Sequence, residues 1–298
     1  MKNKTAVVTG ATSGIGTAIA ARLLREGYEV YVLGRDSAYS KSALAKLNRV
    51  SPGRVHWIQA ELASLDSVAM AAHAFLARHG QLNLLICNAG VPGPSGRTDD
   101  GYEVCFGVNY LAHFLLTQKL LPALQAAQGA RVVHVASRAH FDAPVVPYDR
   151  IRQAGTSRFN YREYGESKLA QLLHVKEMAK RYPRIATFGT HPGVVATRVW
   201  RVVPAPIAFI MRLFMRSPKT GAQTSLRCAL EPGLEGDSGA FFENCKRSVG
   251  SPVFERAEGA AELWEKSMEW IKPWLHTSPA LTGGHSAVSF QRPPLASP

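Results

Sequence analysis

The chain alternates short apolar runs with longer segments whose apolar residues recur at helical spacing, and this alternation restricts its fold most. The short runs are rich in β-branched residues and largely apolar on both faces, which is typical of strands buried on both sides. They cover residues 5–9, 29–33, 54–59, 83–87, 131–136 and 185–190. Helices are predicted at residues 14–26, 65–79, 104–127, 164–181, 218–229 and 257–270. This order predicts an α/β fold with a single, doubly wound parallel sheet that carries helices on both faces.

Residues 1–275 are predicted to form one domain. A chain of 298 residues, 46% of them hydrophobic, is long enough to bury one large core. No internal repeat or linker interrupts this part of the sequence. Residues 276–298 are rich in Pro, Ser, Gly and Thr, so we predict a disordered tail there.

The chain is basic, with 35 Lys and Arg residues against 22 Asp and Glu residues and a net charge of +13. Such a surface can attract nucleic acid, an anionic membrane or a phosphorylated ligand, and it can equally be a solvated face. Because no nucleic-acid-binding motif accompanies the charge, we predict no nucleic-acid partner.

The spacing of the cysteines and the sequence at the N-terminus indicate the cellular compartment in which the protein is expected. The four cysteines, Cys87, Cys105, Cys228 and Cys245, are scattered without C-x-x-C spacing, which argues against a metal site and a disulfide framework. The first strand begins too early for a signal peptide or an anchor helix to precede it. These features predict a soluble protein of the cytoplasm.

A glycine-rich turn follows the first predicted strand and opens the first predicted helix. Glycine there permits a tight turn and lets the backbone approach a pyrophosphate, which helix N–H groups and the helix dipole then favour. The turn therefore predicts a Rossmann-type dinucleotide site, although glycines at such a junction also serve turn geometry alone. The predicted contacts are Gly10, Thr12, Ser13, Gly14, Ile15 and Gly16.

The end of the second strand bears on which dinucleotide is bound. NAD-binding proteins usually place an acidic residue there for the ribose hydroxyls, but this chain has Gly34 followed by Arg35. A guanidinium can bind a 2′-phosphate, so Arg35 favours NADP. Asp36 keeps NAD as an alternative, since a shift of one residue in register would place its carboxylate at the ribose.

Tyr164 and Lys168 lie four positions apart, so a helix places them on one face. A free tyrosine, with a pKa near 10, is a poor proton donor or acceptor at neutral pH. A nearby ammonium favours the phenolate and lowers this pKa. Tyr164 could then exchange a proton with an alcohol or alkoxide; alternatively, the tyrosine packs and the lysine is solvated.

Together these residues resemble the short-chain dehydrogenase/reductase family over residues 4 to 272. The amino-acid sequence at residues 108–117, 167–170 and 221–226 is most similar to its retinol-dehydrogenase-like and WW-domain-oxidoreductase-like branch. The family landmarks appear in order as the glycine turn at residues 9–16, Asn88-Ala89-Gly90, Asn109, Ser137, Tyr164 to Lys168, and His191-Pro192-Gly193 with Thr197.

The resemblance implies a role for each matching residue. Tyr164 would be the acid or base, Ser137 would hydrogen-bond the substrate oxygen, and Lys168 would also bind the nicotinamide ribose. Asn109 would hold a water that relays protons from Lys168. The implied cofactor contacts further along the chain are Glu61, Leu62, Asn88, Ala89, Gly90, Pro192, Gly193, Val195 and Thr197. Glu61 stands where the family usually has an aspartate.

The implied activity is NAD(P)-dependent hydride transfer between the nicotinamide and a lipophilic aldehyde, ketone or alcohol. A non-catalytic NADP(H)-binding redox sensor or scaffold of the same fold is an alternative. A sugar-nucleotide epimerase is less consistent with the sequence, because such enzymes have a G-x-x-G-x-x-G turn and a separate substrate domain.

Two segments are predicted to form the substrate mouth, residues 141–163 and a lid at about residues 199–216. The lid is apolar and carries Arg201, Arg212 and Arg216, which favours a lipophilic substrate drawn from peripheral contact with a membrane. Packing of the lid on its own domain is the alternative. The helices at residues 104–127 and 164–181 suit either a homodimer face or the interior of a monomer.

Nearby histidines are interpreted as structural. His113 lies in an apolar helix and is predicted to be a packed core residue rather than a ligand. His134 and His140 flank Ser137, but no G-x-S-x-G elbow surrounds this serine, so an acyl-transfer triad is not predicted.

Overall fold

A mostly parallel sheet runs through the residues that the computed structural model describes: 4–92, 95–157, 160–193 and 217–275. Within these ranges the sheet has eight strands. In spatial order they are β3 (Val55–Gln59), β2 (Glu29–Gly34), β1 (Thr5–Thr9), β4 (Leu84–Cys87), β5 (Arg131–Val135), β6 (Ala186–His191), β7 (Phe241–Glu243) and β8 (Lys246–Ser248). Only the β7–β8 pair is antiparallel. The predicted fold class is confirmed.

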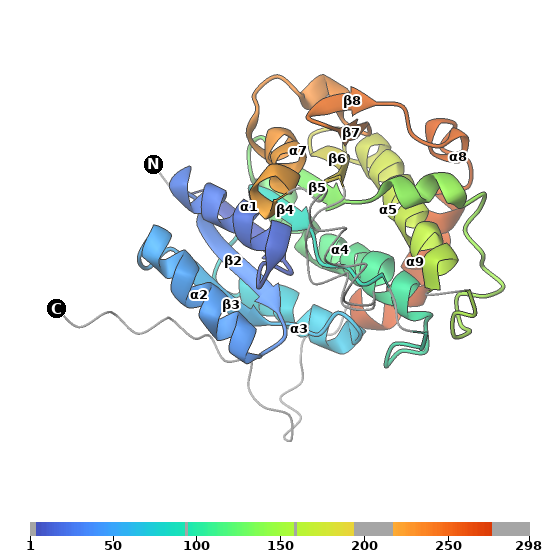
Figure 1. The fold of residues 1–298 in the computed structure, drawn as a ribbon, viewed down its shortest axis with the longest axis horizontal. Coiled ribbons are helices and arrows are strands. Elements are labelled where there is room, and N and C mark those ends of the chain that lie inside the picture. Colours follow the sequence, from blue (N-terminus) through green and yellow to red (C-terminus); the bar gives the residue numbers. More distant parts are fainter. Residues whose placement is uncertain (1–3, 93–94, 158–159, 194–216, 276–298) are drawn as a thin grey trace, which may run out of the picture.

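Helices cover both faces of the sheet (Figure 1). One face carries α1 (Gly14–Arg25), α2 (Ala38–Val50) and α7 (Pro218–Leu230). The other carries α3 (Leu65–Leu76), α4 (Ala112–Ala126), α5 (Tyr161–Arg181) and α9 (Ala260–Leu275). Shorter elements are the π-helix η1 (Phe106–Leu111), the 3-10 helices η2 (Arg138–Asp142) and η5 (Glu235–Asp237), and α8 (Pro252–Glu255).

The sequence prediction missed β7, β8 and α2 and did not divide the helix at residues 104–127. β7 and β8 have three residues each, which is too short to show an apolar period. α2 was missed because its buried positions include Ser40 and its exposed face carries further Ser and Lys residues. The helix predicted at residues 104–127 is divided by backbone geometry, since its first part is the π-helix η1.

The order of the strands places the site. The chain winds outward from β1 to β2 and β3, and then from β4 to β5 and β6 on the other side. This reversal lies between β1 and β4, and ligands of such sheets bind beyond the carboxyl ends of the strands near that point. The glycine turn after β1, Asn88 after β4 and Ser137 after β5 therefore converge on one edge.

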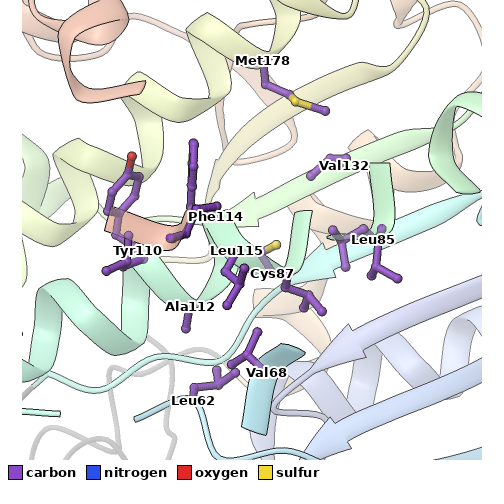
Figure 2. Packing of buried hydrophobic residues seen from close by; sticks show 14 of the residues in the cluster. Leu62, Val68, Leu85, Cys87, Tyr110, Ala112, Phe114, Leu115, Val132 and Met178 are labelled. Carbon is purple, nitrogen blue, oxygen red and sulfur yellow. The ribbon is translucent and has the colours of Figure 1, made fainter. Parts of the chain in front are cut away.

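The core under α4 and α5 is closely packed and extends to α9. Figure 2 shows Leu85, Cys87 and Val132 of the sheet facing Phe114 and Leu115 of α4. α9 closes this layer, and its Trp264 ring lies 5.0 Å from that of Phe114, centroid to centroid.

The last described turn of α9 is also tied to the core. The Lys119 ammonium donates to the carbonyl oxygens of Trp274 and Leu275. The tail predicted at residues 276–298 lies outside the described residues. Among the described helices, none has both the length and the apolar character needed to cross a bilayer.

Candidate active site

The glycine turn is packed directly against the Asn88-Ala89 turn that follows β4. Gly10 has a positive φ of 68°, and a Cβ there would lie 2.9 Å from the Cα of Ala89. A Cβ at Gly16 would lie 2.5 Å from Nδ2 of Asn88, which itself donates to the Thr9 carbonyl at 2.9 Å. Glycine is thus required at both positions, because the Asn88-Ala89 turn lies too close to leave room for a Cβ.

The first turn of α1 keeps its N–H groups available. The side chains of Ser37, Ser64, Ser217 and Ser251 each accept a backbone N–H at the start of their helices. Ser13, at the corresponding position of α1, makes no such bond, and no acidic residue lies in the first turn. Backbone N–H groups that no side chain caps, together with the positive end of the helix dipole, favour binding of an anion such as a phosphate. Thr12, Ser13, Gly14 and Ile15 are all partly exposed there.

Arg35 and Glu61 meet at the carboxyl ends of β2 and β3. Arg35 Nε lies 3.7 Å from a carboxylate oxygen of Glu61, and the Arg35 side chain is 77% exposed. The guanidinium is therefore exposed to a ligand at this edge. Leu62 differs, because its side chain is buried in the core beside Val68 (Figure 2); only its backbone remains for a cofactor.

Ser137 and Tyr164 face one another across η2 and α5. Ser137 is the N-cap of η2 and accepts the Ala139 N–H at 3.2 Å, which leaves its own proton for a hydrogen bond with the Tyr164 side chain. Gly165 makes this approach possible, since a Cβ there would lie 2.7 Å from the Ala139 carbonyl oxygen. The role of Gly165 was not predicted, because nothing in the sequence indicates which backbone crosses it.

Lys168 is buried behind Tyr164. Its Nζ donates to the Val135 carbonyl oxygen at 3.0 Å and to Gln171 Oε1 at 2.8 Å, and it lies 5.4 Å from the centre of the Tyr164 ring. The two side chains thus share one face of α5, as the i, i+4 spacing predicts. Gln171 was not predicted as a partner of Lys168.

The pKa of Tyr164 is shifted in the direction opposite to the one predicted from its spacing to Lys168. Burial raises the pKa of Tyr164 to about 12, and its hydrogen bond with Ser137 opposes the rise. Burial also lowers the pKa of Lys168 to about 8. The expected lowering of the Tyr164 pKa by Lys168 is absent, because the ammonium is directed at Val135 and Gln171 and desolvation of the phenol dominates. Tyr164 is therefore a protonated phenol at neutral pH.

Asn109 links the π-helix to α5 through its side chain. Nδ2 donates to Ser167 Oγ at 2.9 Å and to the Val91 carbonyl at 3.0 Å. Oδ1 accepts the Val91 N–H at 2.7 Å. The Ser167 hydroxyl in turn donates to the Tyr164 carbonyl at 2.7 Å. Asn109 therefore fixes the helical turn that carries Tyr164.

His140 supports Ser137 through the backbone and takes no part in a triad. Its Nδ1 lies 2.7 Å from the Ser137 carbonyl oxygen, and its Nε2 accepts the Ser251 N–H at 3.0 Å. A carbonyl can only accept, so Nδ1 carries the proton and neither nitrogen is available to the serine hydroxyl.

The residues after β6 are described only in part. Pro192 and Gly193 are half-buried, and Gly193 has a positive φ of 80°. Val195, Thr197 and the lid at residues 199–216 lie outside the described residues. In the segment between Ser137 and Tyr164, the side chains of Phe141, Val145 and Tyr161 are exposed by 42%, 55% and 55%.

Fold and site together define a dinucleotide-dependent oxidoreductase, and the comparisons with known proteins give its family. The family model for short chain dehydrogenase matches residues 4–148. Retinol dehydrogenase 12 of Homo sapiens is 38% identical over 278 residues, which cover 91% of this chain and 87% of that protein. Dehydrogenase/reductase SDR family member 13 of Homo sapiens is 37% identical, covering 90% of this chain and 73% of that protein.

The fold has a close counterpart among solved structures. An uncharacterized protein from Mycobacterium Paratuberculosis aligns with a TM-score of 0.71 and 28% identity, covering 90% of this chain and 93% of its own. The chain belongs to the short-chain dehydrogenase/reductase family, in its retinol-dehydrogenase-like branch, and is an NAD(P)-dependent oxidoreductase.

Proposed function

We propose that this chain uses NADP(H) to interconvert a lipophilic aldehyde or ketone and the corresponding alcohol, with Tyr164, Lys168, Ser137 and Asn109 at its catalytic centre. The observation that supports this most is the placement of Ser137 against Tyr164, with the Lys168 ammonium held behind the same helical turn. A hydroxyl pair of this kind can bind a carbonyl oxygen and supply it with a proton.

The chain's own residues fit a dinucleotide. The uncapped first turn of α1 would receive the pyrophosphate, and the Asn88-Ala89-Gly90 turn beside it would line the adenosine ribose. When bound, the nicotinamide supplies or accepts the hydride, and the protein contributes orientation and electrostatics. We propose as contacts Gly10, Thr12, Ser13, Gly14, Ile15, Gly16, Arg35, Glu61, Leu62, Asn88, Ala89, Gly90, Tyr164, Lys168, Pro192, Gly193, Val195 and Thr197.

The preference for NADP(H) rests on Arg35. Its exposed guanidinium stands at the end of β2, while Gly34 offers no carboxylate to the ribose hydroxyls. We expect kcat/KM to be higher for NADPH than for NADH. An NADH preference of tenfold or more would reject the proposal.

Proton transfer would start from a neutral Tyr164. Since the phenol is protonated at neutral pH, it can give its proton to the oxygen of a carbonyl that is being reduced, while Ser137 hydrogen-bonds the same oxygen. Asn109 and Ser167 hold this helical turn in place.

Two observations support a lipophilic substrate. Relatives at 33–38% identity are named retinol dehydrogenases, and Phe141, Val145 and Tyr161 expose apolar surface in the segment between Ser137 and Tyr164. Deleting residues 202–215 of the proposed lid should raise KM for all-trans-retinaldehyde more than for a short aldehyde such as propanal. Equal effects on the two aldehydes would argue against a lid role.

A turnover assay tests the function as a whole. Purified protein is mixed with NADPH and a panel of aldehydes and ketones, and absorbance at the nicotinamide band is followed. We expect oxidation of NADPH with at least one lipophilic carbonyl. Tight NADPH binding without turnover across the panel would instead favour a redox sensor or scaffold.

We further propose a cytoplasmic monomer that contacts membranes peripherally. α9 already covers α4 and α5, and its Leu263, Trp264 and Ile271 are buried against them; this supports a monomer over a dimer built on that face. Size-exclusion chromatography with light scattering tests the monomer. Flotation with anionic liposomes tests the membrane contact, and protein that stays wholly in the soluble fraction would contradict it.

A further inference from the structure

His113 of α4 is fully buried, and each of its two ring nitrogens has a hydrogen-bond partner. Nδ1 lies 2.9 Å from the backbone carbonyl oxygen of Asn109, and Nε2 lies 2.9 Å from the Thr9 hydroxyl. Because a carbonyl oxygen can only accept, Nδ1 carries the proton. In the neutral ring Nε2 is then the acceptor for the Thr9 hydroxyl, which defines a single tautomer.

The surroundings of His113 keep it neutral. Burial lowers the pKa of His113 to about 4, and the Lys168 ammonium on α5 acts in the same direction. The neighbouring rings of His134 on β5 and His174 on α5 are also buried, and burial lowers the pKa of each. The acceptor lone pair on Nε2 is therefore available throughout the physiological pH range.

The Thr9 hydroxyl needs that acceptor. It accepts the backbone N–H groups of Asn88 at 2.9 Å and of Ala89 at 3.0 Å. Its own proton then points either to His113 Nε2 at 2.9 Å or to the Ile86 carbonyl at 3.3 Å. The shorter distance favours His113, so the imidazole orients the hydroxyl that holds the Asn88-Ala89 turn.

We propose that His113 is a positioning residue that couples the two ends of the site. Through the Thr9 hydroxyl it holds the Asn88-Ala89 turn on the cofactor side. Through the Asn109 carbonyl it holds the turn of η1 that carries Asn109 on the catalytic side. The inference rests on the proposed function, since it takes Asn88 and Ala89 as cofactor contacts and Asn109 as part of the catalytic centre. Its sequence context, an apolar helix, indicated only a packed core residue.

His174 provides a matched comparison. It is also buried, it packs on Phe114 of α4 at 4.9 Å between ring centroids, and neither of its nitrogens has a hydrogen-bond partner among the described residues. A histidine that serves packing alone has the environment of His174. His113 differs from it in having both nitrogens engaged.

Three substitutions of His113 separate its two bonds. Asn reaches the position of Nδ1 and keeps a donor for Asn109, whereas Gln reaches the position of Nε2 and keeps an acceptor for Thr9. His113→Phe removes both bonds and keeps a ring, and His174→Phe is the control that removes no bond to a described residue. Titration of nicotinamide fluorescence gives the NADPH Kd of each full-length variant, and steady-state assays give kcat.

We expect His113→Asn to raise the NADPH Kd about fivefold to tenfold with kcat little changed, as for the loss of one buried hydrogen bond. His113→Gln should lower kcat by a similar factor with Kd little changed. His113→Phe should show both effects and His174→Phe neither. If His113→Phe behaves like His174→Phe, the positioning role is wrong.

A second measurement needs neither turnover nor a folded variant. The ¹⁵N shifts of the His113 ring in the wild-type chain should report a protonated Nδ1 and an unprotonated Nε2 at pH 7. A protonated Nε2 would overturn the inference. Failure of the proposed oxidoreductase activity would appear separately, as the absence of turnover in a wild-type protein that still shows this tautomer and binds NADPH.

Discussion

The Lys168 ammonium donates to the Val135 carbonyl oxygen at 3.0 Å, two residues before Ser137 on the same strand end. This bond fixes α5 against β5 and so sets the position of Tyr164 relative to Ser137. It also places a cation in a buried environment, which makes the protonation of Lys168 sensitive to pH near the working range.

The first prediction concerns the pH dependence of carbonyl reduction. Because the pKa of Lys168 is about 8 in the folded protein, the ammonium is lost above that pH, while Tyr164, with a pKa of about 12, stays protonated. We expect kcat/KM for reduction to fall above pH 8, because loss of the ammonium weakens the bonds to Val135 and Gln171 that hold the Tyr164 turn beside Ser137. A profile that stays flat to pH 10 would show that the charge of Lys168 is not needed.

The same shift predicts a change in stability. An unfolded lysine keeps its proton up to about pH 10.4, whereas the folded chain releases it near pH 8. Between these values the unfolded state binds more protons, so the free energy of unfolding rises with pH. The Tm of the wild type should therefore rise relative to that of Lys168→Met from pH 8 to 10.4, and parallel curves would contradict the buried ammonium.

Gly165 should be intolerant of a side chain. A Cβ would lie 2.7 Å from the Ala139 carbonyl, so Gly165→Ala must move α5 away from η2 and separate Tyr164 from Ser137. We expect kcat to fall on the order of 10- to 100-fold with little change in the NADPH Kd. Gly236→Ala in η5, which places a Cβ with nothing within 4 Å, is the control; equal kcat values for the two variants would refute the argument.

Much of this architecture follows from the sequence, and the remainder depends on tertiary contacts. The six longer strands show a continuous apolar run, whereas β7 and β8 are too short to do so. The motif residues Ser137, Tyr164 and Lys168 are brought together as expected, and their catalytic roles stay predictions. The pKa of Tyr164 was expected in the wrong direction because burial depends on packing that no local pattern encodes.

Residues that act through a neighbour were missed for the same reason. Gly165 matters because the Ala139 carbonyl crosses it, and Gln171 matters because its amide oxygen accepts a hydrogen bond from Lys168. Thr9 lies within the predicted glycine turn, but its bonds to Asn88 and Ala89 join residues about 80 positions apart. Such relations become visible only once the strands are assembled.

Arg35 is predicted to set the cofactor preference. Arg35→Ala should raise the KM for NADPH about tenfold, as for loss of a charge-assisted hydrogen bond, and leave the KM for NADH nearly unchanged. Arg49→Ala removes the same charge from an exposed position near the end of α2 and serves as the control. Equal changes for both cofactors would assign Arg35 a general electrostatic effect instead.

Transfer of an isotopic label tests the central claim most directly. The protein is incubated with NADPH deuterated at both C4 positions of the nicotinamide and with a lipophilic aldehyde, and the alcohol is examined by mass spectrometry. We expect the wild type to form an alcohol carrying one added deuterium, and Tyr164→Phe to bind NADPH but form almost none. An unlabelled alcohol, or equal labelled product from Tyr164→Phe, would contradict hydride transfer assisted by Tyr164.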